Sequence, residues 1–216
     1  MISEEKKLFH INETKKHKQK VKDYLGLISK ILEKRGNTHD DSKLENMENE
    51  IFSVYSSKLK DCTYGSEDYK RYLNEMRPAL KHHYMNNRHH PEHFEDGIRG
   101  MNLIDLMEMV MDWLAASKRH DSGNIMKSIE LNMSRFGYDE TLNDIFKNTI
   151  EYLNEYRMEE VEKLYTPEDN DNVKSIVHDW MVGKYIYSKK YKKMYTEKER
   201  ERASEIILDL ISSGLG

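Results

Sequence analysis

The segment NLIDLMEMVMDWLAAS, residues 102–117, is the most apolar part of the chain and has the pattern of an α-helix. Asn102 is a favourable N-cap residue for this helix. Asp105, Glu108 and Asp112 stand at positions i, i+3 and i+7, so their carboxylates share one stripe of the helix. Burying an unpaired carboxylate costs several kcal/mol, and Asp112 has only apolar neighbours in sequence. We therefore expect Asp112 to pair with a Lys or Arg side chain or to bind a metal ion.

Helical periodicity also marks the segments on both sides. A first helix is expected from Glu13 to Arg35, a second after THDDSK (38–43), and a third that Pro78 kinks or restarts. Further helical segments are expected at 125–136, 142–164, 173–191 and 198–211. The apolar positions expected to face inward are Val21, Tyr24, Ile28 and Ile31, then Leu44, Met47, Ile51 and Val54, then Tyr69, Leu73, Met76 and Leu80.

The composition favours an all-α fold. Glycine (10) and proline (3) make up about 6% of the 216 residues, about half the usual share, which is too little for the many turns of an all-β protein. The net charge of -4 argues against binding to nucleic acid or an anionic membrane by bulk charge. A single cysteine, Cys62, excludes an intramolecular disulfide framework. Because we find no signal peptide or transmembrane stretch, we expect a cytoplasmic protein.

The chain is expected to have two parts. Residues 1–137 are expected to form a helical domain that contains the candidate metal-binding and catalytic residues. Residues 138–216 are expected to form a C-terminal helical extension that packs on this domain. In this extension we interpret the basic stretch KKYKK (189–193) as a solvated helix face rather than a nucleic-acid contact. The amphipathic final helix is compatible with closing a homodimer.

Five of the ten histidines lie within HHYMNNRHHPEH, residues 82–93. A neutral imidazole is the commonest metal ligand in proteins, so this density favours a metal site over a surface patch. His39 and Asp40 lie between two helices, where both side chains can reach one ion, although Asp40 is also a plausible N-cap. His17 lies on the same face of the first helix as Val21, where a histidine packed in the core is the plain alternative to a ligand.

The order of these features resembles the HD-domain superfamily, whose members are all-helical, metal-dependent proteins and mostly phosphohydrolases. HDDSK (39–43) is similar to the superfamily's HD-x-x-K form, and HHPEHFEDG (89–97) to the HH-E segment of its HD-GYP branch. MVMDWLAAS (109–117) is similar to the helix that carries the superfamily's last aspartate. The resemblance covers about residues 14–120, and the chain also looks like an uncharacterised bacterial and phage branch of small HD-like proteins.

The resemblance implies specific roles. One metal would be held by His17, His39, Asp40 and Asp112, and a second by His83, His89 and His90. Lys43 would meet the substrate, while Asp40 and Asp112 would take part in catalysis. Asp105 and Glu108 would orient ligand histidines, and Arg88, Glu92 and Arg99 would lie near the ligands or the substrate. His82 and His93 remain as supporting or surface residues.

Mixed His and Asp ligands suit one or two divalent ions of Mn, Fe, Co, Ni or Zn, with Mg as a further candidate. The expected activity is hydrolysis of a nucleotide or another small phosphate ester by metal-activated water. Two alternatives stay open: a diiron oxygenase of the HD type, and a non-catalytic HD-like protein that binds or sequesters a nucleotide. The expected partner is a small phosphorylated substrate. Binding to a membrane or to nucleic acid is not expected.

Overall fold

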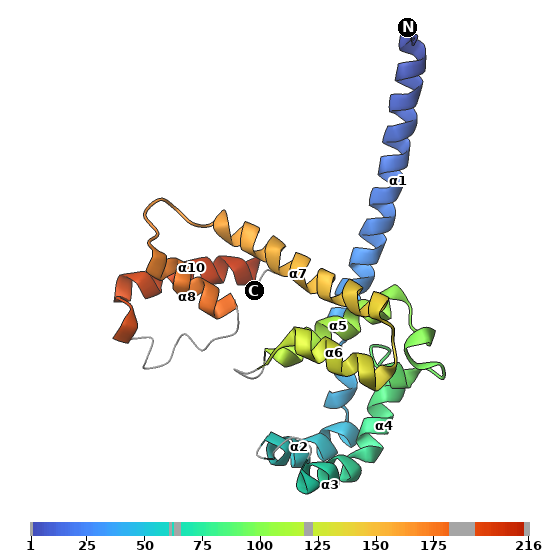
Figure 1. Ribbon diagram of the computed structural model, residues 1–216, viewed down its shortest axis with the longest axis vertical. Coiled ribbons are helices and arrows are strands. Elements are labelled where there is room, and N and C mark those ends of the chain that lie inside the picture. Colours follow the sequence, from blue (N-terminus) through green and yellow to red (C-terminus); the bar gives the residue numbers. More distant parts are fainter. Residues whose placement is uncertain (1, 61, 63–65, 119–122, 182–192, 214–216) are drawn as a thin grey trace. The chain divides into compact units, whose positions relative to one another are not determined.

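A computed structural model describes residues 2–60, 62, 66–118, 123–181 and 193–213 (Figure 1). Within these residues the secondary structure is entirely helical, which confirms the predicted all-α fold and is consistent with an HD-like helical bundle. The chain divides into two compact units, residues 1–109 and 110–216, and the division falls inside helix α5. The predicted boundary at 137/138 stays a prediction. No helix in the described part is long and apolar enough to span a membrane.

The helices follow the predicted order. The elements of the first unit are α1 (Glu4–Asn37), η1 (Asp41–Leu44), α2 (Asn46–Lys60), α3 (Glu67–Glu75), α4 (Arg77–Asn86), η2 (Pro91–His93) and η3 (Gly97–Gly100), and α5 (Leu103–Ser117) follows. The second unit contains α6 (Ile125–Phe136), α7 (Glu140–Glu162), α8 (Asp171–Met181) and α10 (Glu197–Ser212). As predicted, Pro78 marks a restart, because it stands in the first turn of α4, where its missing N–H costs no hydrogen bond.

In the first unit α2, α3 and α4 pack against one another. The short helix η1 lies against α2 and α4, and η2 lies against α4. The inward face predicted for α2 is wrong at three of its four positions: Leu44, Met47 and Val54 are exposed, while Ile51 is half-buried. The buried side of α2 instead begins with Glu48, which is fully buried, and continues through half-buried Phe52 and Tyr55. The helix is thus turned so that a carboxylate, not its most apolar stripe, faces the interior.

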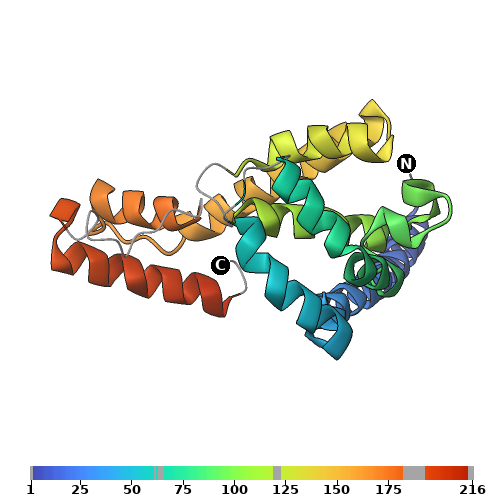
Figure 2. The ribbon, with the colours of Figure 1, turned by 90° about the horizontal axis from the view of Figure 1, so that it is seen from below.

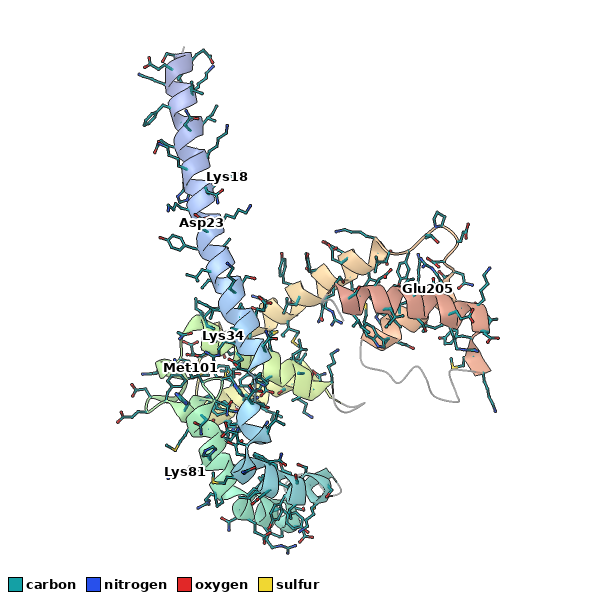
Figure 3. The ribbon with its side chains drawn as sticks, turned by 180° about the vertical axis from the view of Figure 1, so that it is seen from behind. Lys18, Asp23, Lys34, Lys81, Met101 and Glu205 are labelled. Atoms are coloured by element: carbon teal, nitrogen blue, oxygen red, sulfur yellow. The ribbon has the colours of Figure 1, made fainter. Side chains whose placement is uncertain are left out.

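Helix α1 has no buried residue. The predicted inward stripe is exposed along its whole length, from 38% at Ile31 to 67% at Tyr24, so this prediction is wrong as well. Figure 3 shows the side chains of α1 spreading into solvent, Lys18 and Asp23 among them. Only the last turns of α1 contribute to the interior of the unit, through half-buried Leu32 and Arg35.

The second unit has two small cores. The Trp113 ring contacts the rings of Phe136, Tyr138 and Phe146, and α6 packs along α7. Helices α8 and α10 lie side by side (Figure 2) and bury an aliphatic cluster that includes Val177 and Leu210. Most of the stretch KKYKK, residues 189–192, lies outside the described residues.

Candidate metal centre

Four segments of the first unit bring histidines and carboxylates together. His39 and Asp40 lie in the turn between α1 and η1, and His83 lies on α4. His89 lies in the loop that follows α4, and Glu108 lies on α5. Asp40 adopts the left-handed conformation with φ 61°, unusual for a residue other than glycine but accessible to aspartate. Its side chain makes no capping hydrogen bond to η1, so the plain N-cap interpretation does not explain this residue.

Imidazole nitrogens converge on the Asp40 carboxylate. The Nε2 atoms of His83 and His89 lie 3.3 Å and 3.4 Å from Asp40 Oδ1, and that of His39 lies 3.6 Å from Oδ2. His90 joins them, because its Nε2 atom is 2.9 Å from His83 Nε2. Asp40, His83, His89 and His90 each offer one ligand atom, and these four atoms all lie within 4.8 Å of one another. We call these four residues the Asp40 cluster.

Two carboxylates, buried Glu48 and half-buried Glu108, hold the opposite edges of the rings. Glu48 Oε2 lies 3.0 Å from His83 Nδ1, and Glu108 Oε1 lies 2.9 Å from His39 Nδ1 and 3.1 Å from His89 Nδ1. An ionised carboxylate can only accept, so these contacts favour the tautomer in which Nδ1 carries the proton and Nε2 keeps its lone pair. Carboxylates behind histidines are the usual support of metal ligands, because they fix the tautomer and the ring orientation.

A second group of possible ligands, His39, His89 and Glu108, shares His89 with the Asp40 cluster. Its two shortest contacts are the hydrogen-bond distances from Glu108 to the ring Nδ1 atoms. We therefore interpret Glu108 as the support of these histidines, which is the role the resemblance implied for it. Its other oxygen, Oε2, is ion-paired with Arg35.

The electrostatics of the cluster are those of a cation site. Burial would raise the pKa of Asp40, but the neighbouring His89 imidazole and Lys43 ammonium hold it well below its ordinary value. For Glu108 burial is likewise outweighed, here by His39 and His89, and its pKa is lowered. Burial and then Lys43 lower the pKa of His83, which favours the neutral ring. The pKa of His89 is raised, because its contacts with the Asp40 and Glu108 carboxylates outweigh its burial. The cluster therefore presents an ionised carboxylate together with the His83 ring, which is favoured in its neutral form.

Two buried atoms at this point make no hydrogen bond of normal geometry within the described part of the chain, Asp40 Oδ1 and His89 Nε2, and they face each other at 3.4 Å. A buried polar atom without a partner is costly, and such atoms are rare in native structures. A divalent cation between the two atoms would satisfy both of them. The donor set, a carboxylate oxygen with imidazole nitrogens, is also the set that divalent transition metals prefer.

A polar network supports Glu48 from behind. Ser42 donates to Glu48 Oε2 over 3.0 Å, and Asn87 donates to Ser42 Oγ over 2.7 Å. Ser42, Glu48 and Asn87 are all buried. His82 also contacts this carboxylate, with Nδ1 2.6 Å from Glu48 Oε1. The sequence analysis missed Ser42, Glu48, Asn87 and Arg35.

Several predicted site residues lie elsewhere. His17 is exposed on α1, and neither it nor Asp112, one turn beyond Glu108 on α5, belongs to either group of possible ligands. Asp105 does not orient a histidine: it is fully buried and bonded to Arg35 (3.0 Å) and Arg88 (2.8 Å). The charge of Arg88 is therefore already matched by a carboxylate.

Of the remaining predicted residues, Lys43 directly contacts the Asp40 cluster. Lys43 Nζ lies 2.5 Å from Asp40 Oδ2. Glu92 is exposed on η2 and lines a neighbouring pocket, and Arg99 is exposed on η3. His93 lies with Nδ1 3.1 Å from the carbonyl oxygen of Tyr84 and so supports the loop rather than the cluster.

The comparisons with known proteins give one match. The sequence model of DUF5662, a family of unknown function, matches residues 6–167. The match covers 162 of the 216 residues and includes every member of the Asp40 cluster. Neither the curated proteins nor the solved structures contain a match to the chain. The chain belongs to the DUF5662 family of unknown function.

Proposed function

We propose that this protein is a metal-dependent phosphohydrolase that acts on a nucleotide or another small phosphate ester. The observation that carries the proposal is the convergence of imidazole Nε2 atoms on Asp40, with Glu48 and Glu108 holding the Nδ1 edges. Such a doubly supported ligand set has no simple structural purpose, because the same space filled by apolar side chains would avoid the desolvation of buried Glu48 and half-buried Glu108.

The residues that would hold the metal are Asp40, His83, His89 and His90, with His39 beside them. Mn, Fe, Co, Ni and Zn are all compatible with these nitrogen and oxygen donors, and Mg less so. A divalent ion bound there would lower the pKa of a water molecule and withdraw charge from a phosphoryl oxygen. Whether one ion or two bind is a question for metal analysis.

Lys43 is suited to a role toward the substrate. Its ammonium group contacts Asp40, and its side chain is 38% exposed, so it borders both the cluster and solvent. A cation at that position would neutralise a phosphate brought to the cluster, as the HD-x-x-K resemblance implies. Arg88 is less suited to this role because Asp105 already binds it through two hydrogen bonds.

We also propose that the DUF5662 family is a branch of the HD-domain superfamily. The all-helical fold, the order of the HD dipeptide and the later histidines, and the carboxylate-bearing α5 support this proposal. His17 and Asp112 do not, because both lie outside the groups of possible ligands. Under this proposal, His83 and His89 would bind the metal in place of His17 and Asp112.

The test is phosphate release from a panel of nucleotides and simple phosphate esters, with the protein loaded in turn with Mn, Co, Zn, Ni, Fe and Mg. We expect release with at least one metal and loss of release in Asp40→Asn. The exposed neighbour Asp41 provides the matched control, Asp41→Asn, which should retain activity. No release with any metal, from a protein that binds metal stoichiometrically, would contradict hydrolysis. Oxygen consumption by a protein that holds two irons would then favour the diiron oxygenase.

A further inference from the structure

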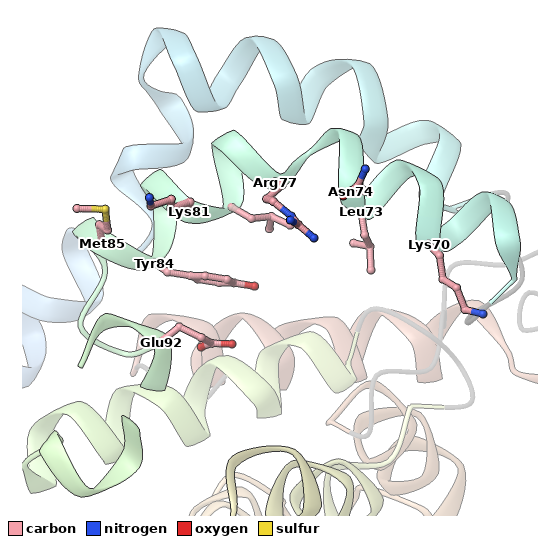
Figure 4. A pocket seen from close by; sticks show the side chains of 9 residues that line it. Lys70, Leu73, Asn74, Arg77, Lys81, Tyr84, Met85 and Glu92 are labelled. Atoms are coloured by element: carbon pink, nitrogen blue, oxygen red, sulfur yellow. The ribbon is translucent and has the colours of Figure 1, made fainter. Parts of the chain in front are cut away.

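A pocket of about 630 Å³ lies on the first unit, between α3, α4 and η2 (Figure 4). This volume is in the range of small-molecule sites, roughly 300–1,000 Å³. Leu73, Leu80 and Tyr84 contribute apolar surface, and Arg77 and Glu92 contribute charge. In Figure 4 the side chains of Arg77, Tyr84 and Glu92 point into the same space.

The pocket borders the Asp40 cluster through Tyr84. The Tyr84 ring lines the pocket, and its centroid lies 4.9 Å from that of His90 and 6.0 Å from that of His83. Glu92 lines the pocket from η2, two residues after His90. A molecule in the pocket would therefore be separated from the ligand histidines by a single aromatic ring.

Arg77 and Lys81 are two of the three cations that line the pocket. Neither makes an ion pair or a side-chain hydrogen bond with any residue that the structure describes, whereas Lys70, a third lining cation, pairs with Glu67. In a chain with net charge -4, two unpaired cations at an apolar pocket favour an anionic ligand. A guanidinium binds phosphate through two parallel hydrogen bonds, which suits Arg77 to that role.

We propose that this pocket is a binding site for a nucleoside phosphate beside the Asp40 cluster and distinct from it. Arg77 binds the phosphate, the apolar wall of Leu73 and Tyr84 takes the base, and Glu92 accepts a hydrogen bond from a hydroxyl or amino group. This binding requires no metal and does not depend on the proposed hydrolysis.

The test is isothermal titration of the full-length protein with adenosine, guanosine, cytidine and uridine 5′-monophosphates, each compared with its nucleoside and with inorganic phosphate. We expect at least one nucleotide to bind about tenfold more tightly than both of its parts. Arg77→Ala should weaken this binding about tenfold or more, because it removes the bidentate phosphate contact. Arg71→Ala, which removes an exposed guanidinium of α3 that does not line the pocket, should change it less than about twofold.

Two outcomes would overturn the inference: no nucleotide binds better than its nucleoside or phosphate, or Arg77→Ala binds like the wild type. Glu92→Gln adds a second test, because it should change the preference among the four bases without unfolding an exposed η2. Asp40→Asn separates this inference from the hydrolase proposal. If it loses metal and activity but still binds the nucleotide, both proposals are supported. If the wild type binds the nucleotide but holds no metal, only the hydrolase fails.

Discussion

Replacing Glu48 by Gln tests the supporting role of this buried carboxylate. Glu48 Oε1 faces His82 Nδ1 at 2.6 Å, and Oε2 faces His83 Nδ1 and Ser42 Oγ, both at 3.0 Å. Glutamine has nearly the same shape but turns one of the two acceptors into an NH₂ donor. The fully buried side chain cannot turn to water, so one of the three hydrogen bonds is lost unless a histidine changes its tautomer.

The amide has one tolerable orientation. If its NH₂ group faced His83 Nδ1, that ring would have to move its proton to Nε2, which would remove a ligand of the proposed metal. If it faces His82, the His82 proton moves to Nε2, which already lies 3.2 Å from the donor Asn86 Nδ2. The second orientation keeps the ligand but leaves a neutral, weaker acceptor behind His83. Supporting residues of this kind change metal affinity by about 10- to 100-fold, so we expect a loss of about tenfold, or about 1.4 kcal/mol.

The assay is metal affinity by competition with a chelator, with thermal unfolding of the metal-free and metal-bound protein recorded in parallel. Glu50→Gln on the exposed side of α2 removes the same charge and is the matched control. We expect the metal-induced gain in Tm to shrink in Glu48→Gln and to stay unchanged in Glu50→Gln. If Glu48→Gln binds metal within twofold of the wild type, Glu48 does not orient a metal ligand and the interpretation of the network is wrong.

Three further predictions concern other parts of the chain. Asp105→Asn should lower the free energy of unfolding by about 2 kcal/mol in urea titrations, because Arg35 and Arg88 lose a fully buried carboxylate; an unchanged midpoint would contradict this. Lys43→Ala should lower kcat/KM for phosphate release by about 100-fold while metal content stays the same, since we propose that Lys43 contacts the substrate and not the ion; loss of the metal would assign Lys43 to its binding. Burial raises the pKa of Tyr138 to about 12, so its contribution to stability is complete below about pH 10 and is lost as the pH rises toward 12. Urea unfolding at pH 9 and pH 12 should show a loss up to about 2.7 kcal/mol larger in the wild type than in Tyr138→Phe, and equal losses would refute the raised pKa.

Much of the centre could be predicted because its residues are close in sequence. The histidines at 82–93 lie on one helix end and the loop that follows it, so local structure alone keeps them together. Asp40 was recognisable because it follows His39 in a turn between two helices. Glu108 was found as one member of the carboxylate stripe on α5, although which member would support the histidines depends on the rotation of that helix.

Glu48 was missed because the apolar stripe of α2 was taken as its inner face. Leu44, Met47 and Val54 are exposed, while Glu48 turns inward and is followed on that side by Phe52 and Tyr55. Those three positions also have the spacing of a helix face, so two stripes competed. Hydrogen bonds to two histidines and Ser42 decide between them, and such bonds become visible only when α4 is placed beside α2.

Helix α1 shows a second limit of periodicity. A stripe of apolar residues indicates that a helix has an apolar face, but it does not identify an element that covers this face. Val21, Tyr24, Ile28 and Ile31 are all exposed, and His17, which the resemblance to the HD-domain superfamily implied as a ligand, is exposed with them. Asp112, for which the resemblance also implied a ligand role, does not belong to either group of possible ligands.

The most direct test of the metal centre is the metal content per chain, measured by elemental analysis on protein purified without a His tag. The wild type, Asp40→Ala and the control Asp41→Ala should be compared after incubation with Mn and Fe and removal of free ions. We expect one or two equivalents of a divalent transition metal in the wild type and in Asp41→Ala, and none or a fraction in Asp40→Ala. No bound metal in the wild type, or equal content in all three proteins, would contradict the assignment of Asp40 and its histidines as a metal centre.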